Sequence, residues 1–135
     1  MNLYIKQRVF SLGDNYDVYD ENQNIVYLVK GLITSIGAIV SIFDYTGKQL
    51  YYIKQRMTFL LAHYELYKDN YLVADVRCEF ALFKPRLSAP SGYGNFSIVG
   101  DIFSMDFEIL KDNVPVGRTS KKWLTWGDTY ELDIY

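Results

Sequence analysis

Hydrophobic and polar residues alternate in short runs along most of the chain. Clear examples are "NYDVYD" at Asn15–Asp20, "HYELY" at His63–Tyr67 and "DFEIL" at Asp106–Leu110. In "TYELDI" at Thr129–Ile134, the tyrosine, leucine and isoleucine share one face and the two acids share the other. Successive side chains of a strand point to opposite faces of its sheet, so this period of two is typical of half-buried strands. The pattern predicts an all-β protein.

An internal repeat organises these runs. The phrase "YIKQR" occurs at Tyr4–Arg8 and Tyr52–Arg56, with looser copies at Tyr27–Gly31, Asp75–Glu79 and Arg118–Lys122. The first four copies start at residues 4, 27, 52 and 75, a spacing of 23 to 25 residues. An alternating phrase follows each copy, and clusters such as "DENQN", "DYTGK" and "KDN" close the units. These clusters are typical of turns, so the unit is strand, connector, strand, turn.

About twelve antiparallel strands, arranged as six hairpins, follow from this unit. We expect them near residues 3–10, 15–20, 25–32, 38–44, 49–58, 62–68, 71–80, 81–87, 95–101, 105–111, 115–124 and 129–135. The stretch "KPRLSAPSGYGN" at Lys84–Asn95 is expected to be a loop between hairpins. Residues 1–135 are the length of one domain. Twelve such strands either close into a barrel or stack as a sandwich, and closure removes exposed edges.

Four phrases resemble the LURP-one-related family, which is widespread in plants and has bacterial members. They are "LYIKQRVFSLGDNYDVYDENQNIVYLVKG", "YYIKQRMTFLLAHYELYKD", "FKP" at Phe83–Pro85 and "SKKWLTWGDTYELDI". The resemblance covers nearly the whole chain, and the closing phrase is its most specific part. It implies a fold like the tubby C-terminal domain and the phospholipid scramblases, in which a twelve-stranded antiparallel barrel surrounds one hydrophobic helix.

The central helix of that fold has no clear counterpart in the sequence. In the family it follows the last strand, whereas this sequence ends at Tyr135; the most apolar run, Gly31–Phe43, has the Val, Ile, Thr and Gly content of a strand. About eight strands already give a barrel that side chains just fill. We therefore expect an apolar helix or peptide in the barrel, supplied in cis beyond Tyr135 or in trans by another molecule. The alternative is a flattened, sandwich-like barrel filled by its own aromatic side chains.

Charge and composition narrow the functional classes. The formal net charge is −2, without the basic footprint of a nucleic-acid-binding protein. Cys78 is the only cysteine, so no internal disulfide is available. The N-terminus lacks the apolar core of a signal peptide, and the longest uncharged run, Gly31–Phe43, is 13 residues, short of the roughly 18 that span a bilayer. We expect a cytoplasmic protein, free or peripheral to the membrane.

Candidate catalytic residues are few, and each has a simpler structural interpretation. His63 is the only histidine and is expected on the strand face opposite Tyr64. Cys78 lies in a strand phrase without a nearby histidine, and "SGYGN" lacks the lysine and helix of a phosphate-binding loop. Asp14 and Asp128 each follow a glycine, as is common in connectors between strands. We assign no catalytic, cofactor-binding or metal-binding residue and expect a protein that is not an enzyme.

Basic residues are the remaining candidates. Tubby-like domains bind phosphoinositides, so the resemblance implies that copies of the repeat gather cations for phospholipid headgroups. The candidates are Lys6, Arg8, Lys54, Arg56, Lys84, Arg86, Lys121 and Lys122. The alternative is a solvated strand face on which these cations mix with Asp and Glu. Trp123 and Trp126 are either anchors in a membrane interface or packing residues at the barrel rim.

Together these features predict a non-enzymatic tubby-like barrel without a cofactor. Its expected ligand is an anionic phospholipid headgroup, a membrane surface or an apolar segment, and no nucleic acid is expected. The alternative is a structural or protein-interaction scaffold that has no lipid ligand.

Overall fold

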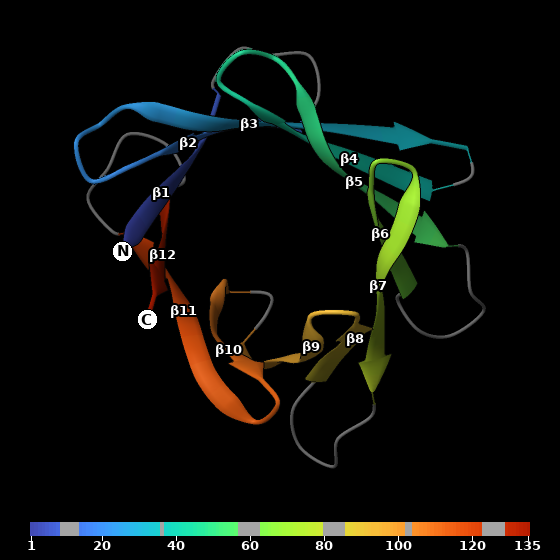
Figure 1. The fold of residues 1–135 in the computed structure, drawn as a ribbon. Helices are drawn as coiled ribbons and strands as arrows, with labels where there is room; N and C mark the ends of the chain where they lie inside the picture. The colour runs from blue at the N-terminus through green and yellow to red at the C-terminus, as the bar shows by residue number, and fades with distance from the viewer. Residues whose placement is uncertain (9–13, 36, 57–62, 80–85, 102–103, 123–128) are drawn as a thin grey trace.

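Twelve antiparallel strands form one closed barrel in the computed structural model (Figure 1). The structure describes residues 1–8, 14–35, 37–56, 63–79, 86–101, 104–122 and 129–135, with the side chain of Glu79 outside this part. Each strand pairs with its neighbours in sequence, and β1 pairs with β12. The strands are β1 (Asn2–Gln7), β2 (Asp14–Tyr19), β3 (Ile25–Thr34), β4 (Gly37–Asp44), β5 (Gln49–Arg56), β6 (His63–Lys68), β7 (Tyr71–Glu79), β8 (Arg86–Ser91), β9 (Gly94–Asp101), β10 (Asp106–Lys111), β11 (Val114–Lys122) and β12 (Thr129–Ile134). The predicted class, strand number and hairpin order are confirmed.

The connector expected over Lys84–Asn95 was wrong in its central part, because Arg86–Ser91 form β8. Pro90 had argued against a strand there, since proline cannot donate to a ladder. The pairing of β7 with β8 links Ala74 to Ser91 and resumes at Arg77 and Ser88, so Pro90 lies where the ladder is interrupted. The strand expected over 81–87 lies mostly outside the described residues.

Tight turns connect the strands at one end of the barrel. Asp69 and Asn70 have φ of 49° and 66°, and Asp112 and Asn113 have φ of 49° and 67°. Two consecutive residues with positive φ are the signature of a type I′ turn, whose twist matches that of a hairpin. The repeated "KDN" phrase therefore encodes the same hairpin turn twice, between β6 and β7 and between β10 and β11.

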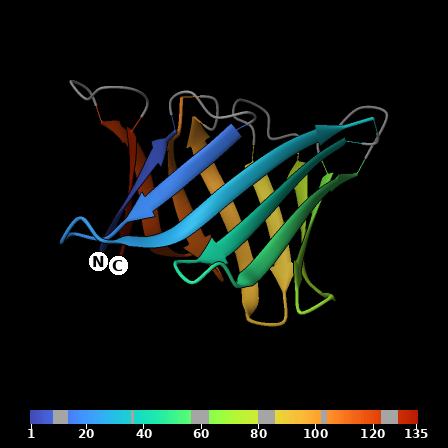
Figure 2. The same cartoon turned by 90° about the horizontal axis from the view of Figure 1, so that it is seen from above.

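The two ends of the chain meet at the same end of the barrel as these turns (Figure 2). The Met1 amino group donates to the Ile134 carbonyl at 3.0 Å, and the Ile134 amide donates to the Met1 carbonyl at 2.8 Å. Five residues of β1 pair in register with β12. We call this end the terminal mouth. The opposite end is where β1, β5 and β11 end, and we call it the basic mouth because the predicted cations lie there.

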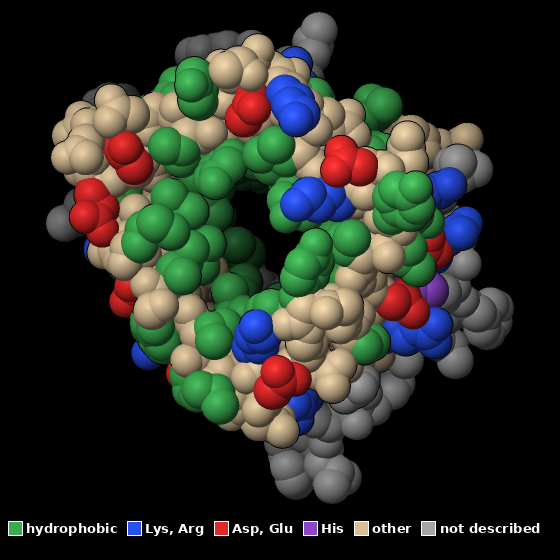
Figure 3. Space-filling view, in the orientation of Figure 1, with side chains coloured by type: hydrophobic (Ala, Val, Ile, Leu, Met, Phe, Trp, Pro, Cys, Tyr) green, Lys and Arg blue, Asp and Glu red, His purple; other side chains and the backbone are tan. Residues whose placement is uncertain are grey.

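The strand register divides the wall into two faces. Residues paired directly across two antiparallel strands share a face, and the pairs can be followed around the whole barrel. One face is almost wholly apolar and the other carries most of the charges. The apolar face includes Ile5, Val29, Ile53, Leu66, Ala89, Ile98, Ile109 and Leu132. Hydrophobic side chains line the central opening in the space-filling view, so this face is the lumen (Figure 3).

The lumen is hollow. Among the described side chains none is less than 2% exposed, and Val18 and Ala74 are the buried hydrophobic residues. The accessible surface is 9566 Å² for a chain of 15.8 kDa, whereas a compact monomer of this mass has about 7,300 Å². On the lumen face, Tyr27 is 38% exposed, although a filled core would bury such a side chain. The described residues include no helix, and thus no helix long and apolar enough to cross a membrane.

Candidate functional site

The lumen has room for one helix. Strands about 4.8 Å apart and tilted by about 40° give a twelve-stranded barrel a backbone radius of about 12 Å. Packed layers of secondary structure lie about 10 Å apart, so a helix on the barrel axis lies within packing distance of every strand. The wall itself leaves this space open (Figure 3).

The two mouths of the lumen differ in charge. All described members of the predicted basic set lie within three residues of the strand ends at one mouth, which is therefore called the basic mouth. They are Lys6 and Arg8 at the end of β1, Lys54 and Arg56 at the end of β5, Arg86 at the start of β8, and Lys121 and Lys122 at the end of β11. Lys84 lies outside the described residues. The turns at the terminal mouth carry Asp20, Glu21, Asp44, Asp69 and Asp112 against Lys48, Lys68 and Lys111.

Three of these cations are held by carboxylates on the next strand. Arg8 donates to Asp17 from Nε at 2.9 Å and from Nη2 at 2.7 Å. Arg56 donates from Nε to Glu65, and the Lys122 ammonium pairs with Glu131. In each case the acid follows the cation by nine residues. The three salt bridges link β1 to β2, β5 to β6 and β11 to β12 on the outer wall.

The carboxylates of these bridges are shielded while the cations reach solvent. Asp17 is 9% exposed and Glu65 is 8% exposed. The hydrogen bonds from Arg56 and from the Tyr67 hydroxyl lower the pKa of Glu65 below its ordinary value. The same contacts raise the pKa of Arg56, and the pairing with Glu131 raises the pKa of Lys122. The bridge between Arg56 and Glu65 therefore stays ionised at neutral pH and stabilises the wall at the basic mouth.

The other basic candidates have different surroundings. Lys6 lies in register with Asp17, and Lys54 with Glu65, so each acid faces two cations of one repeat. Lys121 shares the lumen face with Tyr130, while Lys122 and Arg86 lie on the outer face. The structure thus brings Lys6 and Arg8 of β1 near Lys122 of β11, since these two strands flank β12 and Lys6 and Lys122 both pair in register with Thr129. It places Lys54 and Arg56 on another part of the same mouth.

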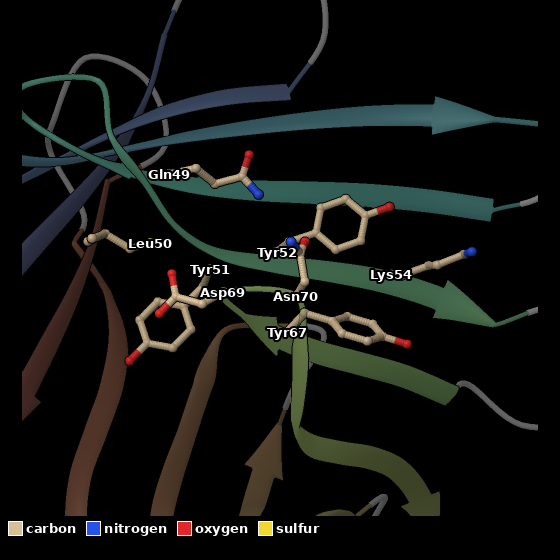
Figure 4. Close-up of a pocket in the computed structure, with 8 residues that line it drawn as sticks. All are labelled: Gln49, Leu50, Tyr51, Tyr52, Lys54, Tyr67, Asp69 and Asn70. Carbon is tan, nitrogen blue, oxygen red and sulfur yellow. The ribbon is translucent and has the colours of Figure 1, made fainter.

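A hollow of about 630 Å³ lies beside the terminal mouth (Figure 4). Tyr51 projects toward the lumen, whereas Lys54 projects away from it along the outer wall. The Tyr52 and Tyr67 rings pack with their centroids 6.0 Å apart. The Lys68 ammonium lies 5.7 Å from the centre of the Tyr51 ring. The hollow thus runs along the wall of β5 and β6, and its lining includes Gln49, Leu50, Asp69 and Asn70.

The remaining candidate residues are part of the wall. His63 lies on the outer face, half-buried, and its Nε2 contacts Asp75. Cys78 is half-buried on β7 and pairs in register with Leu87 on the lumen face. Asp14 begins β2, while Asp128, Trp123 and Trp126 lie outside the described residues. Within the described part of the chain, no three His, Cys, Asp or Glu residues are grouped as metal ligands.

Sequence reasoning identified the cations but missed their partners. The signal that would have found them is the constant spacing of nine residues between the last cation of one phrase and the acid of the next. This spacing connects "YIKQR" to the Asp of "NYDVY" and to the Glu of "HYELY". The repeat therefore encodes a salt bridge as well as two strands.

Comparisons with known proteins place the chain in a family. The family model described as LURP-one-related matches residues 1–135. The chain is 34% identical to the uncharacterised protein YxjI of Bacillus subtilis (strain 168), over 134 residues that span 99% of this chain and 82% of that protein. No solved structure matches the chain. With the closed twelve-stranded barrel and the match over its full length, the chain belongs to the LURP-one-related family.

Proposed function

We propose that the barrel is a non-enzymatic binding module that encloses an apolar segment in its lumen. The observation that carries this proposal is the hollow, apolar-lined interior (Figure 3). Apolar surface left in contact with water favours any occupant that covers it, by about 25 cal/mol for each Å² removed from water. Exposed apolar surface of this extent is typical of binding sites rather than of finished cores.

A helix is the occupant that the geometry favours. Backbone N–H and C=O groups in an apolar interior must be paired, and a helix pairs them within its own segment. A single helix also fits the radius estimated above. The segment comes from the same polypeptide or from another protein, and the experiments below do not depend on which.

Cys78 provides a native probe of the lumen, because its strand position places it on the inner face. We expect a polar maleimide to label Cys78 in the purified chain and a Leu/Ala-rich helical peptide of about 15 residues to protect it. The same peptide should displace a dye that fluoresces in apolar surroundings. An unreactive Cys78 together with no dye binding would show that the barrel's own side chains fill it, and would reject the proposal.

Two matched substitutions separate the lumen from the outer wall. Ile53 faces the lumen on β5, whereas Leu28 lies on the outer face of β3, and both are half-buried. We expect Ile53→Asp to weaken dye and peptide binding at least tenfold and Leu28→Asp to leave both unchanged. Circular dichroism of each variant checks that the barrel is still formed. Equal effects of the two variants would argue against binding in the lumen.

A second candidate function is attachment to anionic phospholipid headgroups through the basic mouth. The observation that favours it is the position of Lys6, Lys54 and the other predicted cations at one end of the barrel. The salt bridges to Asp17, Glu65 and Glu131 weaken it, because they neutralise part of that charge. The alternative without a lipid ligand remains a protein-interaction scaffold.

Sedimentation with vesicles tests the second candidate. We expect vesicles with phosphatidylserine, but not vesicles of phosphatidylcholine alone, to retain the protein at low salt. The double variant Lys6→Glu, Lys54→Glu should abolish this retention. The control Lys48→Glu, Lys68→Glu makes the same charge change at the terminal mouth and should retain binding. Equal loss in both variants would indicate a general charge effect and reject a site at the basic mouth.

A further inference from the structure

Arg86 differs from the other arginines of the described part of the chain. Arg8, Arg56, Arg77 and Arg118 each have a carboxylate partner, namely Asp17, Glu65, Asp75 and Asp106. Arg86 contacts a neutral hydroxyl instead, with its Nη2 donating to Ser97 Oγ at 3.2 Å. Its Nε is buried and has no hydrogen-bond partner. A buried charged donor without an acceptor is costly and calls for an explanation.

Arg8 and Arg86 differ in the contacts made by the Nε and Nη2 edge of the guanidinium. Arg8 uses Nε and Nη2, which form one edge of the guanidinium, to hold the carboxylate of Asp17. The same edge of Arg86 meets only Ser97 Oγ, through Nη2. This edge matches two oxygens of a carboxylate or a phosphate, which it binds through two parallel hydrogen bonds. The Nε and Nη2 edge of Arg86 therefore has a geometry that suits the binding of an oxyanion.

Further donors surround this edge on the outer wall. Ser88 lies between Arg77 and Ser97 in one cross-strand row, because it pairs in register with both. Arg86 lies two residues from Ser88 on the same strand face. Serine hydroxyls donate readily to oxyanions, and the Ser97 side chain is itself buried. Arg86, Ser88 and Ser97 thus share one patch of the outer face, and Arg77, which holds Asp75, lies on the next strand beside Ser88.

A hollow of about 200 Å³ adjoins this patch. Arg86, Ser88, Ser97 and Asn95 line it, and Asp112 and Asn113 of the turn between β10 and β11 line its far end. The Asp112 carboxylate is occupied by the Asn95 amide at 2.9 Å. The hollow therefore has donors at the Arg86 end and an engaged acid at the other end. Its size suits a small ligand rather than a polymer.

We propose that Arg86, Ser88 and Ser97, assisted by Arg77, bind a phosphate-type oxyanion on the outer wall of the barrel. The anion accepts from the Nε and Nη2 edge of Arg86, and it replaces that arginine's present contact with Ser97. Ser97 and Ser88 then donate to the remaining oxygens. This site lies on the outer wall and not in the lumen. A test of oxyanion binding is therefore independent of whether an apolar segment occupies the lumen.

Inorganic phosphate is the probe. At constant ionic strength, we expect phosphate but not chloride to bind saturably to the full chain in calorimetric titration and to raise its Tm. Arg86→Gln should weaken phosphate binding at least tenfold, and Ser97→Ala several-fold. Arg118→Gln is the matched control, since Arg118 lies on the same outer face with its own partner Asp106, and it should leave phosphate binding unchanged. No phosphate-specific binding, or equal losses in the Arg86 and Arg118 variants, would overturn the proposal.

Two further measurements distinguish this site from a structural role of Arg86. Without phosphate, Arg86→Gln should keep or raise the Tm, because it removes a charged group whose buried Nε has no acceptor; a marked fall would show that Arg86 supports the fold. Glu79 lies opposite Arg86 in register. If phosphate binds only after Glu79→Gln, Arg86 is the partner of Glu79 and the proposal is wrong.

Binding to vesicles distinguishes a lipid phosphate from a soluble phosphate as the source of the oxyanion. Phosphatidic acid vesicles that bind wild-type protein but not Arg86→Gln would identify a lipid phosphate. Binding of free phosphate without any vesicle difference between these proteins would identify a soluble phosphate or phosphomonoester. Both results support the oxyanion site.

Discussion

At the scale of single residues, the repeat is explained by the bridges that it forms. Arg8, Arg56 and Lys122 each reach an acid nine residues further on, across the connection at the basic mouth. The acids are more shielded than the cations, with side-chain exposures of 13%, 11% and 15% against 46%, 50% and 46%. Ion pairs at a surface contribute little in general. Shielding of Glu65 and its contact with the Tyr67 hydroxyl make the pair of Arg56 and Glu65 sensitive to pH.

Glu65 should contribute to the loss of folding stability at acidic pH. Its pKa is lowered in the folded state relative to the ordinary value of 4.5. Its contribution is therefore complete above about pH 4.5 and is lost as the pH falls through the lower folded pKa. We expect Glu65→Gln to reduce the Tm most at pH 7 and least near pH 3. Thermal unfolding across this range measures the difference.

Glu108 supplies the control for this pH dependence. It lies on the outer face of β10, in register with Arg118, whose described partner is Asp106. Glu108→Gln should shift the Tm little and by a similar amount at every pH. A gap between wild type and Glu65→Gln that stays constant from pH 7 to pH 3 would contradict the role assigned to the Glu65 charge.

At the scale of elements, the sequence predicted strands well where alternation and turn residues agree. The "KDN" phrases and the "YELY" and "FEIL" runs each give one interpretation, and the structure confirms it. The sequence-based prediction was wrong at β8, where Pro90 and the glycines of Ser91–Asn95 indicated a loop. Proline has no backbone N–H, so it breaks a strand only where the adjacent strand needs that donor. At Pro90 this depends on the pairing of β7 with β8, which the local sequence does not show.

Gly100 tests the fit between two strands. Its φ is 137°, and a Cβ added there would lie 2.8 Å from the Asp106 carbonyl oxygen and 2.9 Å from the Phe107 Cα. Both the backbone conformation and the neighbouring strand exclude a side chain, so Gly100→Ala should destabilise the barrel by about 1–3 kcal/mol. Denaturant unfolding measures this loss.

Gly92→Ala is the matched control, since a Cβ at Gly92 meets no atom within 4 Å. It should change the free energy of unfolding by less than about 0.5 kcal/mol. A cost at Gly92 equal to that at Gly100 would mean that general chain flexibility, rather than the contact between β9 and β10, determines the effect.

At the scale of the whole molecule, the hollow lumen should make the interior tolerant of larger side chains. Ala89 and Ala74 both lie on the lumen face, but Ala89 is half-buried, whereas Ala74 is only 8% exposed because neighbouring side chains already cover it. Adding methylenes to a packed core costs about 1–3 kcal/mol. We expect Ala74→Leu to show such a cost and Ala89→Leu to be neutral or stabilising in chemical unfolding. A cost at Ala89 equal to that at Ala74 would indicate a filled interior.

The barrel as a whole was predictable, and the repeat suggested that its cations gather, but the face on which each cation lies was not predictable. Counting strands, together with the family resemblance, predicted the antiparallel barrel that the structure shows. The grouping of Lys6, Lys54 and Lys122 at one mouth depends on the direction in which each strand runs. The separation of Lys121 from Lys122 depends on register. Register is set by packing and turn geometry around the entire ring, which local sequence does not contain.

The seam between β1 and β12 also bears on how the chain is made. A ribosome releases Asn2–Gln7 first and Thr129–Ile134 more than a hundred residues later, yet these strands are hydrogen-bonded neighbours. Until β12 emerges, the nascent sheet has two open edges and an uncovered apolar face, the combination that favours pairing between chains. At a synthesis rate of about 5–20 residues per second, this interval lasts on the order of ten seconds. During synthesis, β1 therefore needs protection, by a chaperone or a temporary partner, until its last neighbour arrives.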